Sequence, residues 1–263
     1  MLLILKRNDS ELGQQAAELI SHAVRKNPAL RLGLATGTTM RGMYQELVRL
    51  HRDEGLSFSA VVTFNLDEYV GLSASHPHSF HGFMRQHFFD HVDVSPGKIH
   101  IPDGAISGDY LEYCRRYEDA IRQAGGIDLQ VLGIGRNGHV GFNEPTSSLG
   151  SRTRLKVLSQ QTIDDNRSWF GSDAEVPQCA ITMGIGTILE ARRILLLASG
   201  AAKAEAVAKA IEGPVSASVT ASALQMHPDV TFVVDQEAGS QLKEKEYYQR
   251  VLEMTARLTP DRL

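Results

Sequence analysis

The segment VLGIGRNGHVGFNEP, residues 131–145, places groups with acid–base chemistry directly behind a short apolar run. His139 and Glu144 are the groups that exchange protons, and Asn137 lies beside them in the sequence. An imidazole titrates near neutral pH, and a neighbouring carboxylate or amide determines its tautomer. The segment therefore predicts a proton relay at the end of a buried strand.

A second candidate follows the apolar run at residues 60–65, in the segment FNLDEYVG. Asp67 and Glu68 would stand where that strand ends. A carboxylate whose pKa is raised by partial burial suits a general base, and Asp67 is our candidate. The same pair also fits an ordinary solvated turn, because Asp is frequent in turns.

Two further segments offer groups for an anion. In LATGTTMRGMY a Gly/Thr loop precedes a predicted helix, whose first N–H groups and positive dipole end suit a phosphate, although the lysine of a P-loop is missing. In SGAAKAEAV, Lys203 opposes the dipole of another predicted helix, and a bound anion would compensate. Helix capping and a solvated surface lysine explain these residues equally well. The loop consists of Thr36, Gly37, Thr38 and Thr39.

The glycines of the first segment do not predict a dinucleotide cofactor. Gly133, Gly135 and Gly138 match GxGxxG, but Pro145 follows where that motif requires a helix. No acidic residue ends another strand about 20 residues later to bind a ribose. We interpret these glycines as letting a ligand approach the backbone, and we expect no cofactor.

A histidine-rich segment, SHPHSFHGFMRQHFFDHV, raises the question of a metal. A metal site needs a defined set of ligands, and neither cysteines nor an HExxH pattern accompanies these histidines. We expect no metal here, with His78 or His81 as candidates for the border of a pocket. The histidines are His76, His78, His81, His87 and His91.

Composition excludes several classes of partner. The net charge of -4 and the scattered basic residues give no footprint for nucleic acid, and no stretch is long enough to span a bilayer. The N-terminal MLLILKRN is expected to be a first strand rather than a signal peptide. Cys114 and Cys179 are expected to be free thiols, which suits a reducing compartment and a cytoplasmic location. We expect a small-molecule ligand.

The 263 residues are expected to form a single domain, 1–263, without an internal linker. Short apolar runs alternate with segments of helical period, which predicts an open, mostly parallel α/β sheet with helices on both faces, of the Rossmann-like type. The carboxyl ends of its strands would bring the candidate residues together. Strands are expected at residues 30–35, 60–65, 129–134, 194–198 and 231–234. Helices are expected at residues 9–25, 40–54, 80–89, 109–123, 203–211 and 240–256.

Several segments together resemble the glucosamine-6-phosphate deaminase family over nearly the whole chain. The resemblance implies a phosphorylated amino sugar as substrate. It is opened, isomerised from aldose to ketose and deaminated, giving fructose 6-phosphate and ammonia in amino-sugar catabolism without a redox cofactor. The segments are GIGRNGHVGFNEP, FNLDEYVG, LATGTTMRGMY, SRTRLKVL, ITMGIGTIL and SGAAKAEAVAKAIEGPVSASVTASALQMHPDVTFVVD.

The resemblance also implies roles for the candidates. Asp67 resembles the base that moves the C2 proton, and His139 resembles the group that opens the ring, with Glu144 and Asn137 as partners. Family members carry Asp or Asn at position 137, which changes the charge beside the histidine. The residues that resemble the phosphate site are those of the Gly/Thr loop, Arg167 and Lys203.

Some members of the family are activated by N-acetylglucosamine 6-phosphate at a subunit boundary. Ser147, Arg154 and Lys156 resemble part of that site, and the C-terminal LTPDRL does not complete it. The sequence leaves open both activation and a homo-oligomer.

Two other functions fit parts of the pattern. A 6-phosphogluconolactonase would share the fold and a similar loop, although FNEP after His139 fits the deaminases better. A sugar-phosphate sensor would bind phosphate but lack the proton-transfer residues, and Asp67, His139 and Glu144 are all present.

Overall fold

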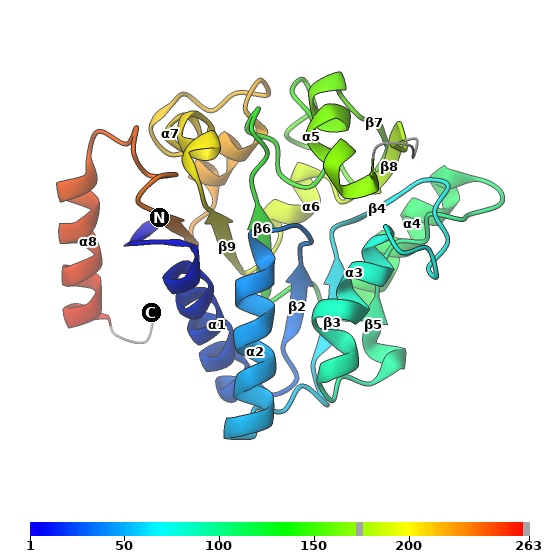
Figure 1. The fold of residues 1–263 in the computed structure, drawn as a ribbon, viewed down its shortest axis with the longest axis horizontal. Coiled ribbons are helices and arrows are strands. Elements are labelled where there is room, and N and C mark those ends of the chain that lie inside the picture. Colours follow the sequence, from blue (N-terminus) through cyan, green and yellow to red (C-terminus); the bar gives the residue numbers. More distant parts are fainter. Residues whose placement is uncertain (172–175, 260–263) are drawn as a thin grey trace.

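The computed structural model describes residues 1–171 and 176–259. A sheet of seven strands runs through this part of the chain (Figure 1), and all its neighbouring strands pair in parallel. In spatial order the strands are β1 (Leu2–Lys6), β10 (Val230–Asp235), β9 (Arg193–Ala198), β6 (Leu129–Gly133), β2 (Arg31–Leu34), β3 (Val62–Asn65) and β5 (Ile99–His100).

Every strand expected from the sequence is present in this sheet, with bounds within two residues of those expected. The apolar runs were informative because central parallel strands are buried on both faces. All residues of β10 are buried, and so are all those of β9 except Arg193. The short strand β5 is only half-buried and has no apolar run, so the sequence did not reveal it.

The expected helices are also present, and two were not foreseen, α5 and α6. Polar side chains begin several of them: Asn8 accepts a hydrogen bond from the Glu11 N–H, and Asp109 accepts one from the Leu111 N–H. The helices are α1 (Asp9–Lys26), α2 (Met40–Glu54), α3 (Phe80–His87), α4 (Tyr110–Gln123), α5 (Gln160–Phe170), α6 (Ile185–Leu189), α7 (Ala204–Glu212) and α8 (Lys245–Leu258). Short 3-10 helices are η1 (Phe89–His91), η2 (Pro96–Lys98), η3 (Ala201–Lys203) and η4 (Thr220–Met226).

The last helix begins later than predicted. It was expected from residue 240, but α8 begins at Lys245. Turns follow β10 instead, because the Asp235 carboxylate accepts a hydrogen bond from the Ala238 N–H at 2.7 Å. This local bond favours a turn over a helix.

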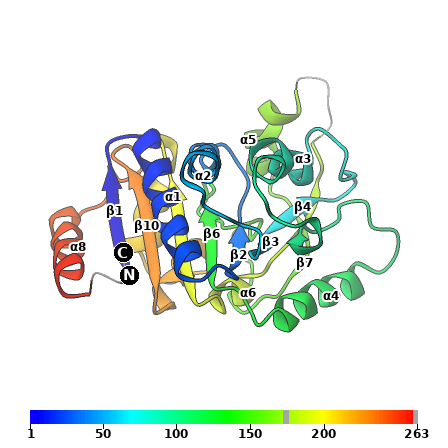
Figure 2. The same cartoon turned by 90° about the horizontal axis from the view of Figure 1, so that it is seen from below.

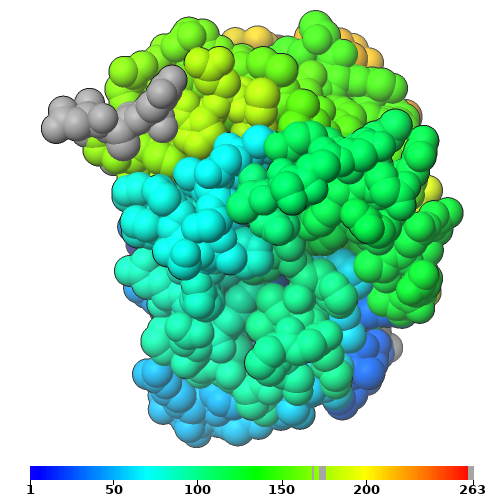
Figure 3. Space-filling model, turned by 90° about the vertical axis from the view of Figure 1, so that its right-hand side faces the viewer, coloured from blue at the N-terminus to red at the C-terminus, as the bar shows by residue number. Residues whose placement is uncertain are grey.

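Helices cover both faces of the sheet, as expected. Figure 2 shows α1 and α2 on one side of the strands and α4 and α6 on the other. At one edge α8 packs against β1. Figure 3 looks onto the opposite edge, which the segments around α3 and α4 cover. Covered edges limit strand pairing between molecules.

A second, smaller sheet stands at the carboxyl ends of the parallel strands, and the sequence did not predict it. Its three antiparallel strands have the order β4 (Asp67–Tyr69), β8 (Cys179–Thr182), β7 (Arg154–Val157). Strands of three or four residues are too short to show a reliable period. Asp67, expected in a loop after β3, therefore begins a strand of its own. A separate small core of Tyr69, Phe142, Leu158, Phe170, Val176 and Ala180 packs here.

Of the helices in the described ranges, none is both long and apolar enough to cross a bilayer. Cys114 is buried, Cys179 is partly buried, and both are free thiols, as predicted.

Candidate active site

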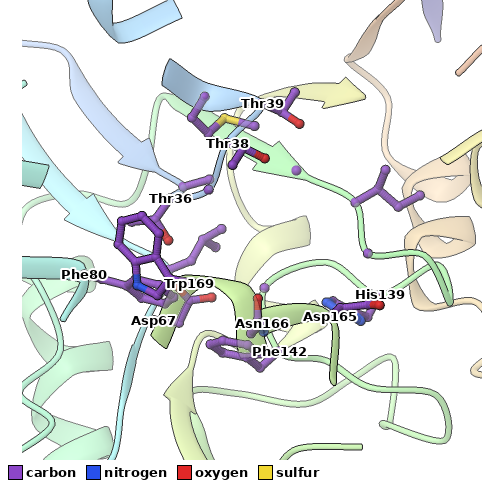
Figure 4. Close-up of a pocket in the computed structure, with 18 of the residues that line it drawn as sticks. Thr36, Thr38, Thr39, Asp67, Phe80, His139, Phe142, Asp165, Asn166 and Trp169 are labelled. Atoms are coloured by element: carbon purple, nitrogen blue, oxygen red, sulfur yellow. The ribbon is translucent and has the colours of Figure 1, made fainter. Parts of the chain in front are cut away.

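A pocket of about 610 Å³ opens at the carboxyl ends of the parallel strands (Figure 4). Its walls come from the loops after β2, β3 and β6, together with α5 and η3. Its volume suits a small-molecule ligand, and open α/β sheets bind ligands at this edge. The predicted residues that line it are Thr36, Gly37, Thr38, Thr39, Asp67, His139 and Lys203.

Asp67 lies at the bottom of the pocket beside aromatic rings. Its backbone pairs with Thr182 across the small sheet, and Phe80 and Phe142 line the pocket near it (Figure 4). The residue is 6% exposed, and within the described part of the chain its carboxylate makes no hydrogen bond or ion pair. Burial, with a smaller contribution from the charge of Glu68, raises the pKa of Asp67 to about 8. This carboxyl group therefore exchanges protons near neutral pH.

Glu68 is fully buried and makes a different set of contacts. Its carboxylate accepts hydrogen bonds from the backbone N–H groups of Tyr69 at 2.8 Å, Phe80 at 3.0 Å and His81 at 3.1 Å. Burial raises the pKa of Glu68 to about 7, although these N–H groups oppose the shift. The carboxylate ties β4 to the first turn of α3. The solvated turn that the sequence left open for Asp67 and Glu68 is therefore not what the structure shows.

His139, Asn137 and Glu144 form a chain of contacts on the other side of the pocket. His139 Nδ1 lies 2.6 Å from Asn137 Oδ1, and Asn137 Nδ2 donates to Glu144 Oε2 at 2.9 Å. Because an amide oxygen only accepts, Nδ1 carries the proton and Nε2 is the free acceptor. His139 Nδ1 and Glu144 Oε2 are 3.6 Å apart, so the amide links them. His139 lines the pocket, and its two partners lie behind it.

The charges of this group follow from its surroundings. Burial lowers the pKa of His139, while the nearby charge of Glu144 opposes that shift and that of Lys203 adds to it. Burial disfavours the charge of Glu144, but hydrogen bonds from Thr162, the charge of His139 and the Ser159 N–H outweigh it and lower the pKa of Glu144. His139 is therefore a neutral base at neutral pH, backed by an ionised carboxylate.

Two glycines of the β6 loop are needed for packing within the protein. A Cβ at Gly135 would lie 2.3 Å from His139 Cε1, and one at Gly138 would lie 2.5 Å from Val219 Cγ1. Gly138 also has a φ of 83°, which favours glycine. Gly133 and Gly135 also line the pocket, so the interpretation that these glycines let a ligand approach the backbone stays a prediction, while Gly138 lies outside the lining.

The Gly/Thr loop leads into α2 with its hydroxyl groups available. Thr39 precedes the helix but makes no side-chain cap, and within the described residues the side chains of Thr36 and Thr38 make no hydrogen bond. Lys203 ends η3 across the pocket. Burial lowers the pKa of Lys203, partly offset by Asp165, while Arg136 adds to the shift. Helix capping by a side chain therefore does not account for the threonines of the loop, and full solvation does not account for Lys203.

Arg167 is not part of this pocket. Its guanidinium pairs with Asp164 at 3.2 Å, and its side chain is 62% exposed. The residues of α5 that line the pocket are instead Asp165, Asn166 and Trp169. Positions 164 and 167 therefore lie outside the face of α5 that lines the pocket. The resemblance gave Arg167 a role in the phosphate site, but a position along the chain does not say which way a side chain of α5 faces.

Ser147, Arg154 and Lys156 lie outside the pocket lining. Arg154 and Lys156 are on the same face of β7, and Arg154 Nη1 donates to Asn143 Oδ1 at 2.9 Å. Ser147 is buried, and its hydroxyl makes no hydrogen bond in the described part of the chain.

Sequence reasoning missed several lining residues, namely Arg41, Arg136, Asp165, Asn166 and Trp169. Arg136 and Asp165 form an ion pair at 2.8 Å between the β6 loop and α5. Arg41 lies over the Trp169 ring, with Cζ 5.5 Å from its centroid. Arg41 and Arg136 stand inside two of the quoted motifs, so their charge beside a predicted anion site was a usable signal.

The histidine-rich segment contributes aromatic rings rather than imidazoles to the pocket. Phe80 and Phe83 line it, whereas His78 and His81 do not, contrary to the border role considered for them. His78 packs against Trp169 and Phe170 outside the lining. Among residues 1–171 and 176–259, no three or more His, Cys, Asp or Glu side chains are grouped to hold a metal ion.

Comparisons with known proteins agree with this site. The family model described as glucosamine-6-phosphate isomerases/6-phosphogluconolactonase matches residues 7–233. A glucosamine-6-phosphate deaminase of Hahella chejuensis is 51% identical over 258 residues, covering 98% of each chain. One of Thermoanaerobacter pseudethanolicus is 47% identical over 246 residues, covering 94% of this chain and 97% of the relative.

Two solved structures were similar to this chain to different degrees. A monomeric glucosamine-6-phosphate deaminase superposes with a TM-score of 0.89 at 48% identity, covering 91% of this chain and 99% of the other. The 6-phosphogluconolactonase of Trypanosoma brucei superposes with a TM-score of 0.72 at 21% identity, covering 92% and 98%. At that identity the second likeness shows a shared fold alone.

Proposed function

The chain belongs to the glucosamine-6-phosphate deaminases within the family of glucosamine-6-phosphate isomerases and 6-phosphogluconolactonases, and from this premise we propose how its pocket performs that reaction. Glucosamine 6-phosphate and water become fructose 6-phosphate and ammonia. The observation that carries the assignment of roles is that Asp67 and His139, two groups able to accept protons near neutral pH, face one pocket from opposite sides.

His139 opens the sugar ring. Its Nε2 takes the proton from the anomeric hydroxyl and returns a proton to the ring oxygen as the C1–O bond breaks, leaving an aldehyde. The imidazolium that forms in between is stabilised by Glu144, which Asn137 holds in place. Because Nδ1 is occupied by Asn137, the ring presents Nε2 to the substrate.

Asp67 then isomerises the open sugar. Its carboxylate takes the C2 proton, and the electron pair moves through C1 to the carbonyl oxygen, which is protonated to give an enolamine. Protonation of C1 yields a C2 iminium ion. Water adds to C2 and ammonia leaves, which gives the ketone of fructose 6-phosphate. The raised pKa of Asp67 suits a base that must also return its proton.

The loop of residues 36–39 and Lys203 bind the phosphate. The free N–H groups, the threonine hydroxyls and the start of α2 supply donors, and Lys203 supplies a charge. Binding energy gained at the phosphate then orients the reacting carbons, which lie at the other end of the substrate.

The test is ammonia release from glucosamine 6-phosphate by the purified chain, with hydrolysis of 6-phosphogluconolactone measured in parallel. We expect ammonia and fructose 6-phosphate without added nicotinamide or metal, and no lactone hydrolysis above the buffer rate. His139→Gln should abolish turnover of the ring form. Lactone hydrolysis without ammonia release would instead identify a lactonase.

We place the reaction in the cytoplasm, because a sugar phosphate carries a charge of about −2 and does not diffuse across a bilayer. We also treat residues 1–263 as a single domain. All residues assigned above come from one chain, so a homo-oligomer is not needed to complete the site. Cell fractionation and sedimentation of the purified chain test the location and the oligomeric state.

A further inference from the structure

Two cations that line the pocket form no ion pair within the described residues, Arg41 and Lys203. The third lining cation, Arg136, is already paired with Asp165. A phosphate monoester carries a charge of about −1.5 to −2 near pH 7, so two unpaired cations match it.

Both unpaired cations lie at the N-terminus of a helix, where the helix dipole disfavours a positive charge. Arg41 is the second residue of α2, and Lys203 immediately precedes α7. A positive charge at a helix N-terminus opposes the macrodipole, and a bound anion removes that conflict. The Gly/Thr loop, with its available hydroxyls, lies directly before Arg41 in the chain.

The position of the Arg41 side chain is determined by its neighbours. Side chains of a helix point back toward its N-terminus, which here leads toward the pocket that Arg41 lines. The guanidinium carbon lies 5.5 Å from the centroid of the Trp169 ring. Nε is buried, and no acceptor for it exists among the described residues. A buried donor without an acceptor is costly, so a ligand oxygen is the natural partner.

Arg167, the arginine that the family resemblance assigns to the phosphate, has none of these properties. It is mostly exposed, it pairs with Asp164, and it does not line the pocket. Bringing it to the ligand would require breaking that pair.

We propose that Arg41, rather than Arg167, is the arginine that binds the phosphate group of the substrate, together with Lys203. This inference rests on the proposed function for the identity of the ligand. The ring of Trp169 supports one side of the guanidinium, and the N–H groups on its edge remain free to bind two phosphate oxygens at once.

The test compares Arg41→Met, Arg41→Lys and Arg167→Met, with Arg52→Met at the far end of α2 as the matched control. Affinity for inorganic phosphate is measured by calorimetry and followed by the fluorescence of Trp169, the only tryptophan of the chain. The kcat and KM for glucosamine 6-phosphate are measured alongside. Methionine keeps a flexible side chain against the Trp169 ring while it removes the charge.

We expect Arg41→Met to weaken phosphate binding and raise KM by about 10- to 100-fold, with kcat changed by less than about threefold. Arg41→Lys should lose less, about 3- to 10-fold, because it keeps the charge but not the planar fork. Arg52→Met should bind phosphate as the unaltered chain does.

Unchanged phosphate affinity in both Arg41 variants would overturn the proposal. A loss in Arg167→Met as large as that in Arg41→Met would also overturn it, because Arg167 would then bind the phosphate as strongly as Arg41 does. These titrations need no turnover. Absence of ammonia release by the unaltered chain would therefore refute the proposed function separately, whatever the variants bind.

Discussion

Asp67 and Glu144 are both nearly buried carboxylates, 6% and 4% exposed, and the protein shifts their pKa values in opposite directions. Asp67 faces the pocket beside aromatic rings, and within the described residues nothing donates a hydrogen bond to it. Glu144 lies behind His139 and accepts hydrogen bonds from Asn137 and from the Ser159 N–H. Burial alone therefore does not determine ionisation, since donors decide whether the buried charge is tolerated.

The difference separates two roles that the residue types do not distinguish. A carboxyl group with a pKa near 8 can take a proton from carbon and give it back, whereas one that stays ionised can only stabilise a neighbouring cation. The β3–β4 region thus supplies the base, and the β6 loop supplies the support for His139.

The largest effect that follows is on turnover. Asp67→Asn should lower kcat by about 10³- to 10⁴-fold, because the general base is lost, while inorganic phosphate binds within about threefold of normal. Solvent-deuterium exchange at C2 of the substrate should disappear. Asp164→Asn, an exposed carboxylate of α5, is the matched control and should keep full activity. Normal turnover in Asp67→Asn would remove that residue from the mechanism.

The next prediction compares how Asp67 and Glu144 change the free energy of unfolding with pH. The folded pKa of Asp67 lies above its ordinary value of 3.8, so its contribution to stability is present below pH 3.8 and is lost as pH rises through about 8. The folded pKa of Glu144 lies below its ordinary value of 4.5, so its contribution is present above that pH and is lost on acidification.

At pH 8, therefore, Asp67→Asn should be more stable than the unaltered chain and Glu144→Gln less stable, each by about 1 to 3 kcal/mol. The free energy of unfolding in urea, measured at pH 5 and pH 8, checks both signs. Shifts of the same sign at pH 8 would show that the two sites are not opposed as described.

A smaller effect is expected when a negative charge is added beside the His139 ring. Asn137→Asp adds a negative charge at 2.6 Å from Nδ1, which should raise the pKa of His139 by about one unit. The corresponding limb of the pH profile of kcat/KM should move to higher pH with substantial activity retained. Asn137→Asp combined with His139→Gln is the control. A shift that survives in this double variant would mean that position 137 acts through another group.

The smallest effect concerns the neighbour of the base. The ionised form of Asp67 is the active one, so kcat/KM should rise with pH around a midpoint near 8. Glu68→Gln removes a like charge and should move that limb to lower pH by less than about one unit. Glutamine retains an acceptor for the Phe80 N–H, and thermal unfolding shows whether α3 is held. A limb that stays in place or moves upward would exclude Glu68 as an influence on the base.

Much of the frame was predictable because apolar runs mark parallel strands directly. The strands that end before Thr36, Asp67 and His139 were foreseen, and the convergence of strand ends predicted that these residues would meet. The small sheet was not foreseen, because β4 has only three residues and its partner β8 is more than 100 residues away along the chain. Sequence periodicity carries no information about such a pairing.

The binding side of the pocket was predictable only in part. The Gly/Thr loop and Lys203 could be recognised from their places before helices. The charge of Arg41 inside LATGTTMRGMY was a usable signal, but its contact with Trp169 could not be recognised, because packing joins α2 to α5 there. The orientation of α5 likewise decides that Asp165 faces the ligand and Arg167 does not.

The sequence by itself determined which groups are available, the order of the parallel strands' apolar runs along the chain, and the strand ends at which those groups gather. Only the tertiary structure decided their charges and directions. The pKa of Asp67 depends on the aromatic wall and on the absence of donors among the described residues, and that of Glu144 on donors from β6 and α5 segments. Both are properties of surroundings assembled from distant parts of the chain, because solvation and hydrogen bonding act through space rather than along the sequence.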